Sequence, residues 1–311
     1  MYNIIRFFLF LFNPEFAHHL AMKSLKVANF FGLLNLISNR NRCKPRTIMG
    51  LQFDSPVGLA AGLDKNAEYI DCLSKLGFGF IEVGTVTPRA QKGNPKPRSF
   101  RLTREMGIIN RFGFNNDGID KVIQNVKKSK FRGILGINIG KNFDTPINKA
   151  IDDYLICFRK SYLFASYITL NISSPNTKDL RKLQGSDNLE KLLRRIKTEQ
   201  NILNKKYKKY VPFLIKISPD NTNFQLSAIC KLLIKHKIDG VIATNTTLSR
   251  NGVSTSNKRN ESGGLSGLPL KSSSLKTQKF LKQKLDGKIP IIGVGGVMSG
   301  EDGKEKIDNG A

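Results

Sequence analysis

The sequence predicts an α/β fold of the β/α-barrel type, and two observations support that prediction. From residue 50 onward, short apolar runs alternate with longer amphipathic stretches, which is the pattern of a parallel sheet covered by helices. Each apolar run also ends directly in polar or glycine residues. In a β/α barrel the carboxyl ends of the strands form the face that carries the active site, so the sequence predicts one such face.

The first forty residues are predicted to form two helices ahead of the barrel. Residues 1–12 are nearly all apolar, but this stretch is too short to cross a bilayer and lacks the cleavage site of a signal peptide. Asn13, Pro14 and Glu15 then supply an N-cap, a first-turn proline and a first-turn acid for a second helix. Apolar residues recur along that helix at helical spacing, namely Phe16, Leu20, Val27, Phe31 and Leu34.

Basic residues flank these two helices, at Arg6, Arg40, Arg42, Lys44 and Arg46. Amphipathic helices with basic flanks are typical of segments that lie at a membrane surface. A helical hairpin packed against the barrel would show the same periodicity, so the pattern leaves both interpretations open.

Seven apolar runs are the predicted strands of the barrel, at residues 57–60, 80–83, 134–138, 167–171, 213–216, 240–244 and 291–294. Amphipathic stretches such as 188–203 and 223–236 lie between most of them and are predicted helices. A doubly wound open sheet is the alternative architecture. No GxGxxG fingerprint follows the first predicted strand, which argues against that alternative.

The predicted strand at 167–171 leads into a markedly polar segment. Residues 171–177 contain two asparagines, two serines and a threonine. Such residues also favour plain turns, so this segment alone fits either a turn or an active-site loop. The recurrence of polar residues after the other predicted strands favours the active-site loop.

Composition narrows the classes of partner. The formal net charge is +27, but the lysines are scattered without interleaved aromatic residues, so we expect no specific nucleic-acid binding. An anionic membrane surface or an acidic substrate is the expected partner of this charge. The four cysteines, at positions 43, 72, 157 and 230, have neither CxxC nor metal-site spacing, so we expect reduced thiols and no metal.

The polar segments form a set of motifs: AAGLDKN at 60–66, EVGT at 82–85, NRFGFNN at 110–116, NISSPNT at 171–177, KISP at 216–219, NT at 245–246, GGLSG at 263–267 and IIGVGG at 291–296. In order and spacing they resemble the dihydroorotate dehydrogenase family. The resemblance implies a flavin-dependent β/α barrel that holds FMN and oxidises dihydroorotate to orotate in pyrimidine synthesis. It covers the chain from its first residues to its last.

Within that family the chain resembles the membrane-associated class that reduces a quinone. Ser174 stands at the position of the catalytic base, where the soluble classes carry cysteine, and the helical N-terminal extension is typical of the quinone class. The resemblance places His18 and Arg101 at the quinone site. It implies peripheral association with the cytoplasmic side of the cell inner membrane.

The resemblance also assigns roles around the substrate. Ser174 would act as the base, and because a serine hydroxyl is a weak base it needs a proton relay, for which Thr177 and Phe114 match the family. Amide side chains offer both a donor and an acceptor to a ring with amide-like edges. The implied substrate-binding residues are Lys65, Asn110, Arg111, Phe112, Gly113, Phe114, Asn171, Asn176, Asn245 and Thr246.

For the FMN cofactor, Lys216 matches the family residue that would stabilise negative charge on the flavin ring. A lysine at the end of an apolar strand is rarely tolerated without a function or a partner. Gly267, Gly295 and Gly296 would let backbone amides approach the phosphate. The implied cofactor-binding residues are Ala61, Gly62, Leu63, Asp64, Lys65, Thr85, Asn138, Asn171, Lys216, Thr244, Gly267, Gly295 and Gly296.

The sequence ends at Ala311, where the family would begin its eighth strand. The expected fold is therefore a (β/α)8 TIM barrel that lacks its last β/α unit, at residues 41–311, with a helical extension at residues 1–40. A dihydroorotate dehydrogenase of the soluble class, or another FMN barrel oxidoreductase, is the first alternative. An inactive, truncated remnant that only binds membranes is the second.

Overall fold

The computed structural model describes residues 2–37, 43–253 and 256–311. Arg40, Arg42 and the predicted domain boundary at residue 40 lie outside the described residues. The four cysteines are free, and three of them, Cys72, Cys157 and Cys230, are buried.

A parallel sheet of seven strands forms the centre of the molecule, in the order β12-β10-β9-β8-β7-β4-β3. Its strands are β3 (Gly58–Leu59), β4 (Phe80–Val86), β7 (Ile134–Ile139), β8 (Tyr167–Asn171), β9 (Phe213–Ile217), β10 (Gly240–Ala243) and β12 (Ile291–Gly293). All seven predicted strands are confirmed. The strand order follows the chain without reversal, whereas a doubly wound sheet reverses at a switch point, so the barrel-type prediction is correct and the alternative is wrong.

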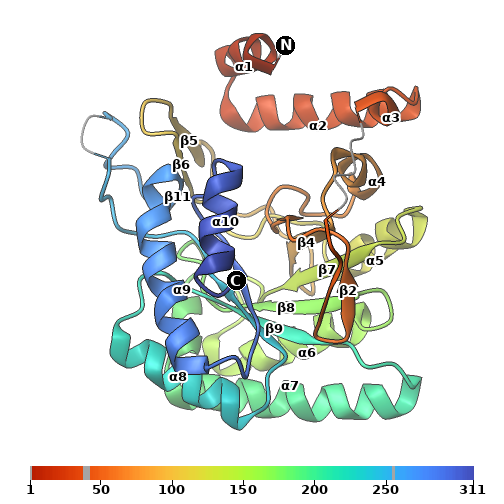
Figure 1. Cartoon of the computed structure of the whole chain (residues 1–311), viewed down its shortest axis with the longest axis vertical. Coiled ribbons are helices and arrows are strands. Elements are labelled where there is room, and N and C mark those ends of the chain that lie inside the picture. The colour runs from red at the N-terminus through yellow and green to blue at the C-terminus, as the bar shows by residue number, and fades with distance from the viewer. Residues whose placement is uncertain (1, 38–42, 254–255) are drawn as a thin grey trace.

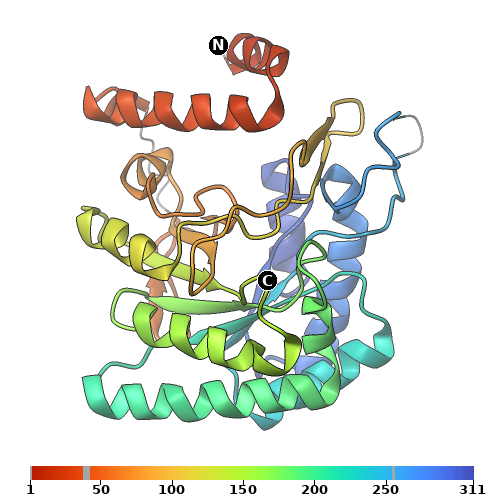
Figure 2. The same ribbon diagram turned by 180° about the vertical axis from the view of Figure 1, so that it is seen from behind.

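Helices cover the outer face of this curled sheet (Figures 1 and 2). They are α4 (Ile70–Leu73), α5 (Ile119–Lys128), α6 (Ala150–Ser161), α7 (Ser186–Tyr207), α8 (Asn223–Lys235), α9 (Lys271–Leu285) and α10 (Gly300–Asp308). The predicted helices at 188–203 and 223–236 correspond to α7 and α8.

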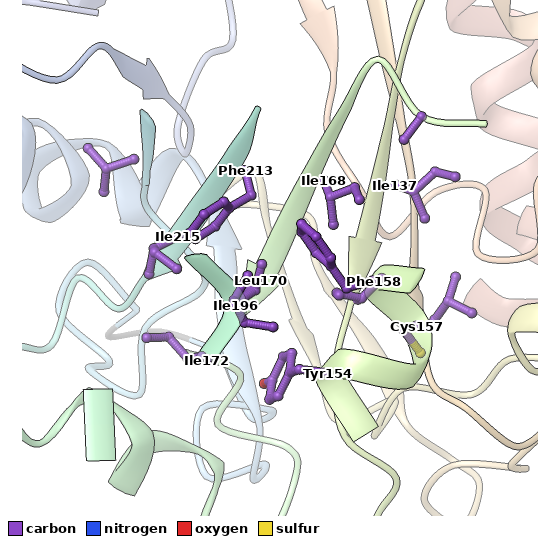
Figure 3. Close-up of a cluster of buried hydrophobic side chains, with 14 of the residues drawn as sticks. Ile137, Tyr154, Cys157, Phe158, Ile168, Leu170, Ile172, Ile196, Phe213 and Ile215 are labelled. Atoms are coloured by element: carbon purple, nitrogen blue, oxygen red, sulfur yellow. The ribbon is translucent and has the colours of Figure 1, made fainter. Parts of the chain in front are cut away.

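The main core lies between the sheet and these helices. Figure 3 shows Tyr154, Cys157 and Phe158 of α6 pointing toward apolar residues of the strands. Phe158 and Phe213 pack edge to face with ring centroids 6.0 Å apart, a favourable geometry for aromatic pairs. Burial of these side chains fixes the strands and thereby the loops at their carboxyl ends.

A second, smaller sheet of three antiparallel strands was not predicted from the sequence. It has the order β11-β6-β5 and consists of β5 (Ser99–Leu102), β6 (Gly107–Asn110) and β11 (Gly264–Gly267). Its strands come from the segments that follow β4 and β10, so it brings Asn110 and Gly264 into register although they are far apart in the sequence. A hairpin of β1 (Arg46–Ile48) and β2 (Leu51–Phe53) precedes β3.

The N-terminal helices lie together at one end of the molecule (Figures 1 and 2). They are α1 (Tyr2–Leu11), α2 (Pro14–Phe30) and α3 (Leu34–Ile37). The predicted start of α2 is confirmed, because Oδ1 of Asn13 accepts a hydrogen bond of 3.0 Å from the Glu15 amide. Met22 and Leu34 join the main core, so α2 and α3 pack against the barrel.

The exposed surface of this extension remains strongly apolar. Large exposed side chains there are Ile4, Ile5, Phe7, Phe8, Phe10, Leu11, Phe12, Phe16, Leu20, Val27, Phe30, Phe31, Leu33 and Leu36. Phe7 and Leu11 of α1 are 64% and 67% exposed. Among the described residues, no helix combines the length and the apolar character needed to cross a bilayer. The packing of α2 therefore supports the interpretation as a helical hairpin on the barrel. The apolar surface of α1 supports the interpretation as a segment that lies at a membrane.

Candidate active site

Polar side chains at the ends of neighbouring strands form one hydrogen-bonded chain. The Asn245 amide donates to Oδ1 of Asn171 at 3.0 Å, and the Asn171 amide donates to the Thr85 hydroxyl at 2.9 Å. Thr85 in turn donates to Oδ1 of Asn138 at 2.6 Å. Four predicted site residues are thus brought together, from β4, β7, β8 and the segment after β10.

This chain continues to a buried carboxylate that was not singled out from the sequence. Glu82, on β4, accepts hydrogen bonds from the Asn138 amide at 2.8 Å and from the Thr169 hydroxyl at 2.9 Å. Its side chain is only 3% exposed. The signal that could have found it is a carboxylate within the otherwise apolar run 80–83, since a buried charge is retained only where it has partners.

Ser174 lies in the loop after β8 and is 6% exposed. Its hydroxyl oxygen accepts a hydrogen bond of 3.2 Å from the Asn176 amide nitrogen. The Asn176 side chain donates to the Asn110 carbonyl at 3.0 Å, and Asn94 donates to the Asn176 carbonyl at 3.2 Å. The small sheet is thereby tied to the serine loop, and Asn94 is a further residue that the motifs did not mark.

The two predicted relay residues occupy different surroundings. The Thr177 hydroxyl is buried without a hydrogen-bond partner among the described residues. Phe114 is buried with φ of 57°, and its ring and Thr85 both flank Gly140, where an added Cβ would lie 2.8 Å from the Phe114 ring. A buried hydroxyl without a partner is uncommon, so Thr177 is a position where a proton-carrying group could bind.

Lys65 lies beside an aromatic ring in the loop after β3. Its amine donates to the Gly62 carbonyl at 2.7 Å and lies 4.4 Å from the centroid of the Phe112 ring. Burial and then the nearby Arg98 charge lower the pKa of Lys65 to about 8. The Asp64 carboxylate accepts hydrogen bonds from the amides of Glu68 and Tyr69, so it holds this loop in shape.

A cavity of about 1050 Å³ lies beside the polar chain. Four predicted cofactor residues line it, namely Lys216, Gly267, Gly295 and Gly296, and Glu82 lines it as well. Thr85, Asn138 and Asn171 connect to it through Glu82, whereas Ala61, Gly62 and Leu63 are not among the lining residues.

Burial dominates the electrostatics of this cavity. It lowers the pKa of Lys216, and the Glu82 carboxylate opposes that shift by favouring the charged amine. Gly295 and Gly296 adopt φ of 107° and 71°, which side chains rarely adopt. At Gly296 an added Cβ would lie 2.4 Å from Cα of Lys271, so only glycine fits there.

Three further predicted residues are positioned by partners of their own. Arg111 pairs with Glu261 at 2.6 Å, at the edge of the small sheet. The Thr246 amide donates to Oδ1 of Asn245 at 2.9 Å, and the Thr244 amide donates to the Val294 carbonyl at 2.9 Å. The loop after β10 is therefore held from both sides. Gly113 lies in the left-handed region, with φ of 71°, between Phe112 and Phe114.

The two residues predicted at the quinone site both contact or belong to the helical extension. Arg101 on β5 donates to the Phe12 carbonyl at 2.8 Å and lies 4.4 Å from the centroid of the Phe10 ring. His18 lies on α2, where burial and then the Lys65 charge lower its pKa to about 4. The imidazole is therefore neutral at physiological pH.

The family model described as "Dihydroorotate dehydrogenase" matches residues 45–311. The chain belongs to the dihydroorotate dehydrogenase family. A relative from Methylobacillus flagellatus named "Dihydroorotate dehydrogenase (quinone)" is 54% identical over the whole chain and 92% of its own length. A relative of the same name from Acinetobacter baumannii is 55% identical over the same shares.

Solved structures of this family agree with the fold. Dihydroorotate dehydrogenase from Eimeria tenella in complex with ferulenol superimposes with a TM-score of 0.87 at 38% identity. The match covers 96% of this chain and 84% of that one. The ligand-free form of the Eimeria enzyme gives a TM-score of 0.85 at the same identity. Both confirm the β/α-barrel assignment for this member of the dihydroorotate dehydrogenase family.

Proposed function

We propose that this chain oxidises dihydroorotate to orotate with FMN as its prosthetic group and passes the electrons to a membrane quinone, in pyrimidine synthesis. The observation that carries the proposal is the continuous polar chain from Asn245 to Glu82, which ends at a cavity lined by Lys216. The relatives named as quinone enzymes, at 54–55% identity, support the choice of acceptor.

The substrate would bind at the amide groups near Ser174. Asn110, Asn171, Asn176 and Asn245 each present both a donor and an acceptor, which suits a ring with amide-like edges. Their side chains are held by hydrogen bonds to one another or to neighbouring backbone, so they are ordered before the substrate arrives. The Lys65 ammonium would attract the substrate carboxylate.

Ser174 would remove the proton from the ring carbon next to the one that gives up a hydride. Its hydroxyl is buried, which excludes water from the reacting carbon. The captured proton must then leave the serine, and the buried Thr177 hydroxyl is the residue we assign to that relay. General-base catalysis of this kind contributes about 10²–10⁴-fold in rate.

The residues of the cavity fit a flavin nucleotide, which when bound supplies the hydride acceptor. Lys216 would stabilise negative charge on the ring, and the backbone at Gly295 and Gly296 would approach the phosphate. We propose FMN as the form of the flavin because it carries the phosphate that the backbone at these two glycines would hold.

The helical extension would serve the membrane and the quinone. The exposed phenylalanine and leucine side chains of α1 form an apolar surface of the kind that enters the boundary between headgroups and acyl chains. Arg101 and His18 would contact the quinone beneath it. We assign residues 1–40 to this role and residues 41–311 to the flavin barrel, with peripheral association at the cytoplasmic side of the inner membrane.

The visible spectrum of the purified chain, before and after anaerobic addition of dihydroorotate, tests this function. We expect a flavin band that bleaches on addition. The bleached protein should then recover its band when a short-chain ubiquinone is added, and stay bleached with fumarate or NAD⁺. A chain that binds vesicles without any flavin band would contradict the proposal and favour a membrane-binding remnant.

A further inference from the structure

A buried ion pair joins the helical extension to the barrel. Glu15, in the first turn of α2, accepts hydrogen bonds from Arg98 at 2.6 Å (Nη2) and 3.2 Å (Nε). Their side chains are only about a tenth exposed, at 10% and 8%. Breaking a buried pair by removing one partner is strongly destabilising, because the other charge is left uncompensated.

Arg98 also organises the segment that precedes it. Its Nη1 donates to the carbonyls of Lys92 and Asn94, at 2.7 and 3.0 Å. Its guanidinium carbon lies 5.6 Å from the centroid of the Phe112 ring. In the same segment, the side-chain amide of Asn94 donates a hydrogen bond to the carbonyl of Asn176, two residues after Ser174. One arginine therefore contacts α2, the 92–98 segment and the Phe112 ring.

Phe112 carries a second cation. The Lys65 amine lies 4.4 Å from the same ring centroid, a favourable distance for an ammonium near an aromatic ring. Glu15, Arg98, Phe112 and Lys65 thus form a continuous line of contacts from the extension to the lysine that we assign to the substrate.

We propose that Glu15 is a positioning residue for the substrate site, which acts through Arg98 and Phe112 to hold Lys65 in place and charged. The consequence is a coupling between docking of the N-terminal helices and affinity for the anionic ligand. This inference rests on the proposed function, because it takes Lys65 as a substrate ligand.

The charges around Lys65 predict the direction in which its pKa changes when Glu15 is replaced. Burial and then the Arg98 charge lower the pKa of Lys65, whereas Glu15 and Asp64 raise it, so the resulting pKa is about 8. Among the described residues His18 also faces Lys65, and its pKa of about 4 leaves it neutral. Removing the Glu15 charge leaves only the Asp64 charge to oppose the effect of Arg98 on Lys65. The Lys65 pKa then falls, and Lys65 loses its proton at a lower pH than in the wild type.

Orotate binding, measured by calorimetry on the flavin-loaded protein across a pH series, tests the proposal. In the wild type we expect affinity to weaken as pH rises through about 8. In Glu15→Gln the midpoint should move to lower pH. Glu190→Gln is the matched control, because Glu190 pairs with Lys235 at the exposed faces of α7 and α8. It should leave the midpoint unchanged.

A double variant keeps the test decisive if the single one does not fold. Glu15→Gln combined with Arg98→Gln leaves no unpaired buried charge, and its folding is checked by thermal melting. At a pH well below the Lys65 pKa, we expect its orotate affinity to fall by about tenfold, because Phe112 and Lys65 lose their support.

The outcomes separate this inference from the proposed function. A wild-type chain that binds flavin but not orotate at any pH would overturn the function and the inference together. Wild-type binding with an unshifted midpoint in Glu15→Gln, or with undiminished affinity in the double variant, would overturn the inference alone.

Discussion

At the scale of single residues, the site depends on amide and hydroxyl groups that bind one another. Asn171 donates to Thr85 and accepts from Asn245, so its side chain is fixed at both ends. Linked hydrogen bonds in a buried setting strengthen one another and specify one arrangement. A substitution of one member would therefore disturb the others. The role of a single residue is best tested at a position outside this network.

Ser174 is such a position, since among the described residues its hydroxyl oxygen accepts one hydrogen bond, from the backbone amide of Asn176. We expect Ser174→Ala to keep its flavin and its melting temperature but to lose about 10²–10⁴-fold in the rate of flavin reduction by dihydroorotate. Stopped-flow absorbance measures that rate. Ser166→Ala, at the opposite end of β8, is the control and should react at the wild-type rate. Near-normal reduction in Ser174→Ala would exclude this serine as the base.

Lys216 tests the cofactor assignment. Because hydrogen bonds and contacts to charged groups contribute about 1.5–3 kcal/mol, Lys216→Met should weaken FMN binding by about 10- to 100-fold. Quenching of FMN fluorescence by the apoprotein measures this affinity. Lys304 lies at the same cavity but is mostly exposed and pairs with Asp308, so Lys304→Met should bind FMN normally. Equal affinity in both variants would contradict the role of Lys216.

The candidate site could be predicted from the sequence where its residues directly follow apolar strands. Asn138, Asn171 and Lys216 were found because strand ends are visible as the ends of apolar runs. Glu15 and Arg98 could not be found as partners, because 83 positions separate them and only the packing of α2 brings them together. Arg111 was predicted at the substrate, yet its guanidinium pairs with Glu261 from a distant loop.

At the scale of elements, α1 and α2 have different relations to the barrel. α2 contributes Ala17 and Met22 to buried positions and pairs through Glu15, whereas most of the described α1 side chains are exposed. Helical periodicity predicted both helices but not this division, because the apolar stripe of a packed helix and that of a membrane-facing helix look alike in sequence.

This division predicts unequal effects of two deletions. Removal of residues 2–12 should leave the barrel folded and allow dihydroorotate to bleach the flavin, while vesicle binding and quinone reduction are lost. Removal of residues 2–37 should also lower stability by about 3–5 kcal/mol, because the main core loses the buried side chains of Met22 and Leu34. Urea unfolding of the two forms distinguishes these outcomes. Full quinone reduction in the shorter deletion would contradict the assignment of α1.

At the scale of the whole molecule, the net charge of +27 and the apolar surface of the extension act together. Basic residues near an anionic membrane contribute about 1 kcal/mol each, and salt screens this attraction. The fold itself was predictable at this scale, since all seven sheet strands appear as apolar runs. The small sheet was not, because the pairing of β6 with β11 joins segments that are far apart in the sequence.

The charge predicts salt-dependent membrane binding. In flotation assays, vesicles that contain phosphatidylglycerol should bind the chain strongly at about 50 mM salt and much less at about 0.5 M. Vesicles of phosphatidylcholine alone should bind weakly at both. Deletion of residues 2–12 should reduce the binding that persists at high salt. Equal binding to neutral and anionic vesicles would show that the charge plays no part.

The order of the strands has a consequence for how the chain folds during synthesis. Each strand of the large sheet pairs with the strand of that sheet made just before it, so the sheet can lengthen step by step as the chain leaves the ribosome. The small sheet cannot be completed in this way, because β5 and β6 can pair at once but β11, the second partner of β6, is made about 150 residues later. Gly267, on β11, is therefore brought into place late, and the part of the site around it is expected to be the last to form.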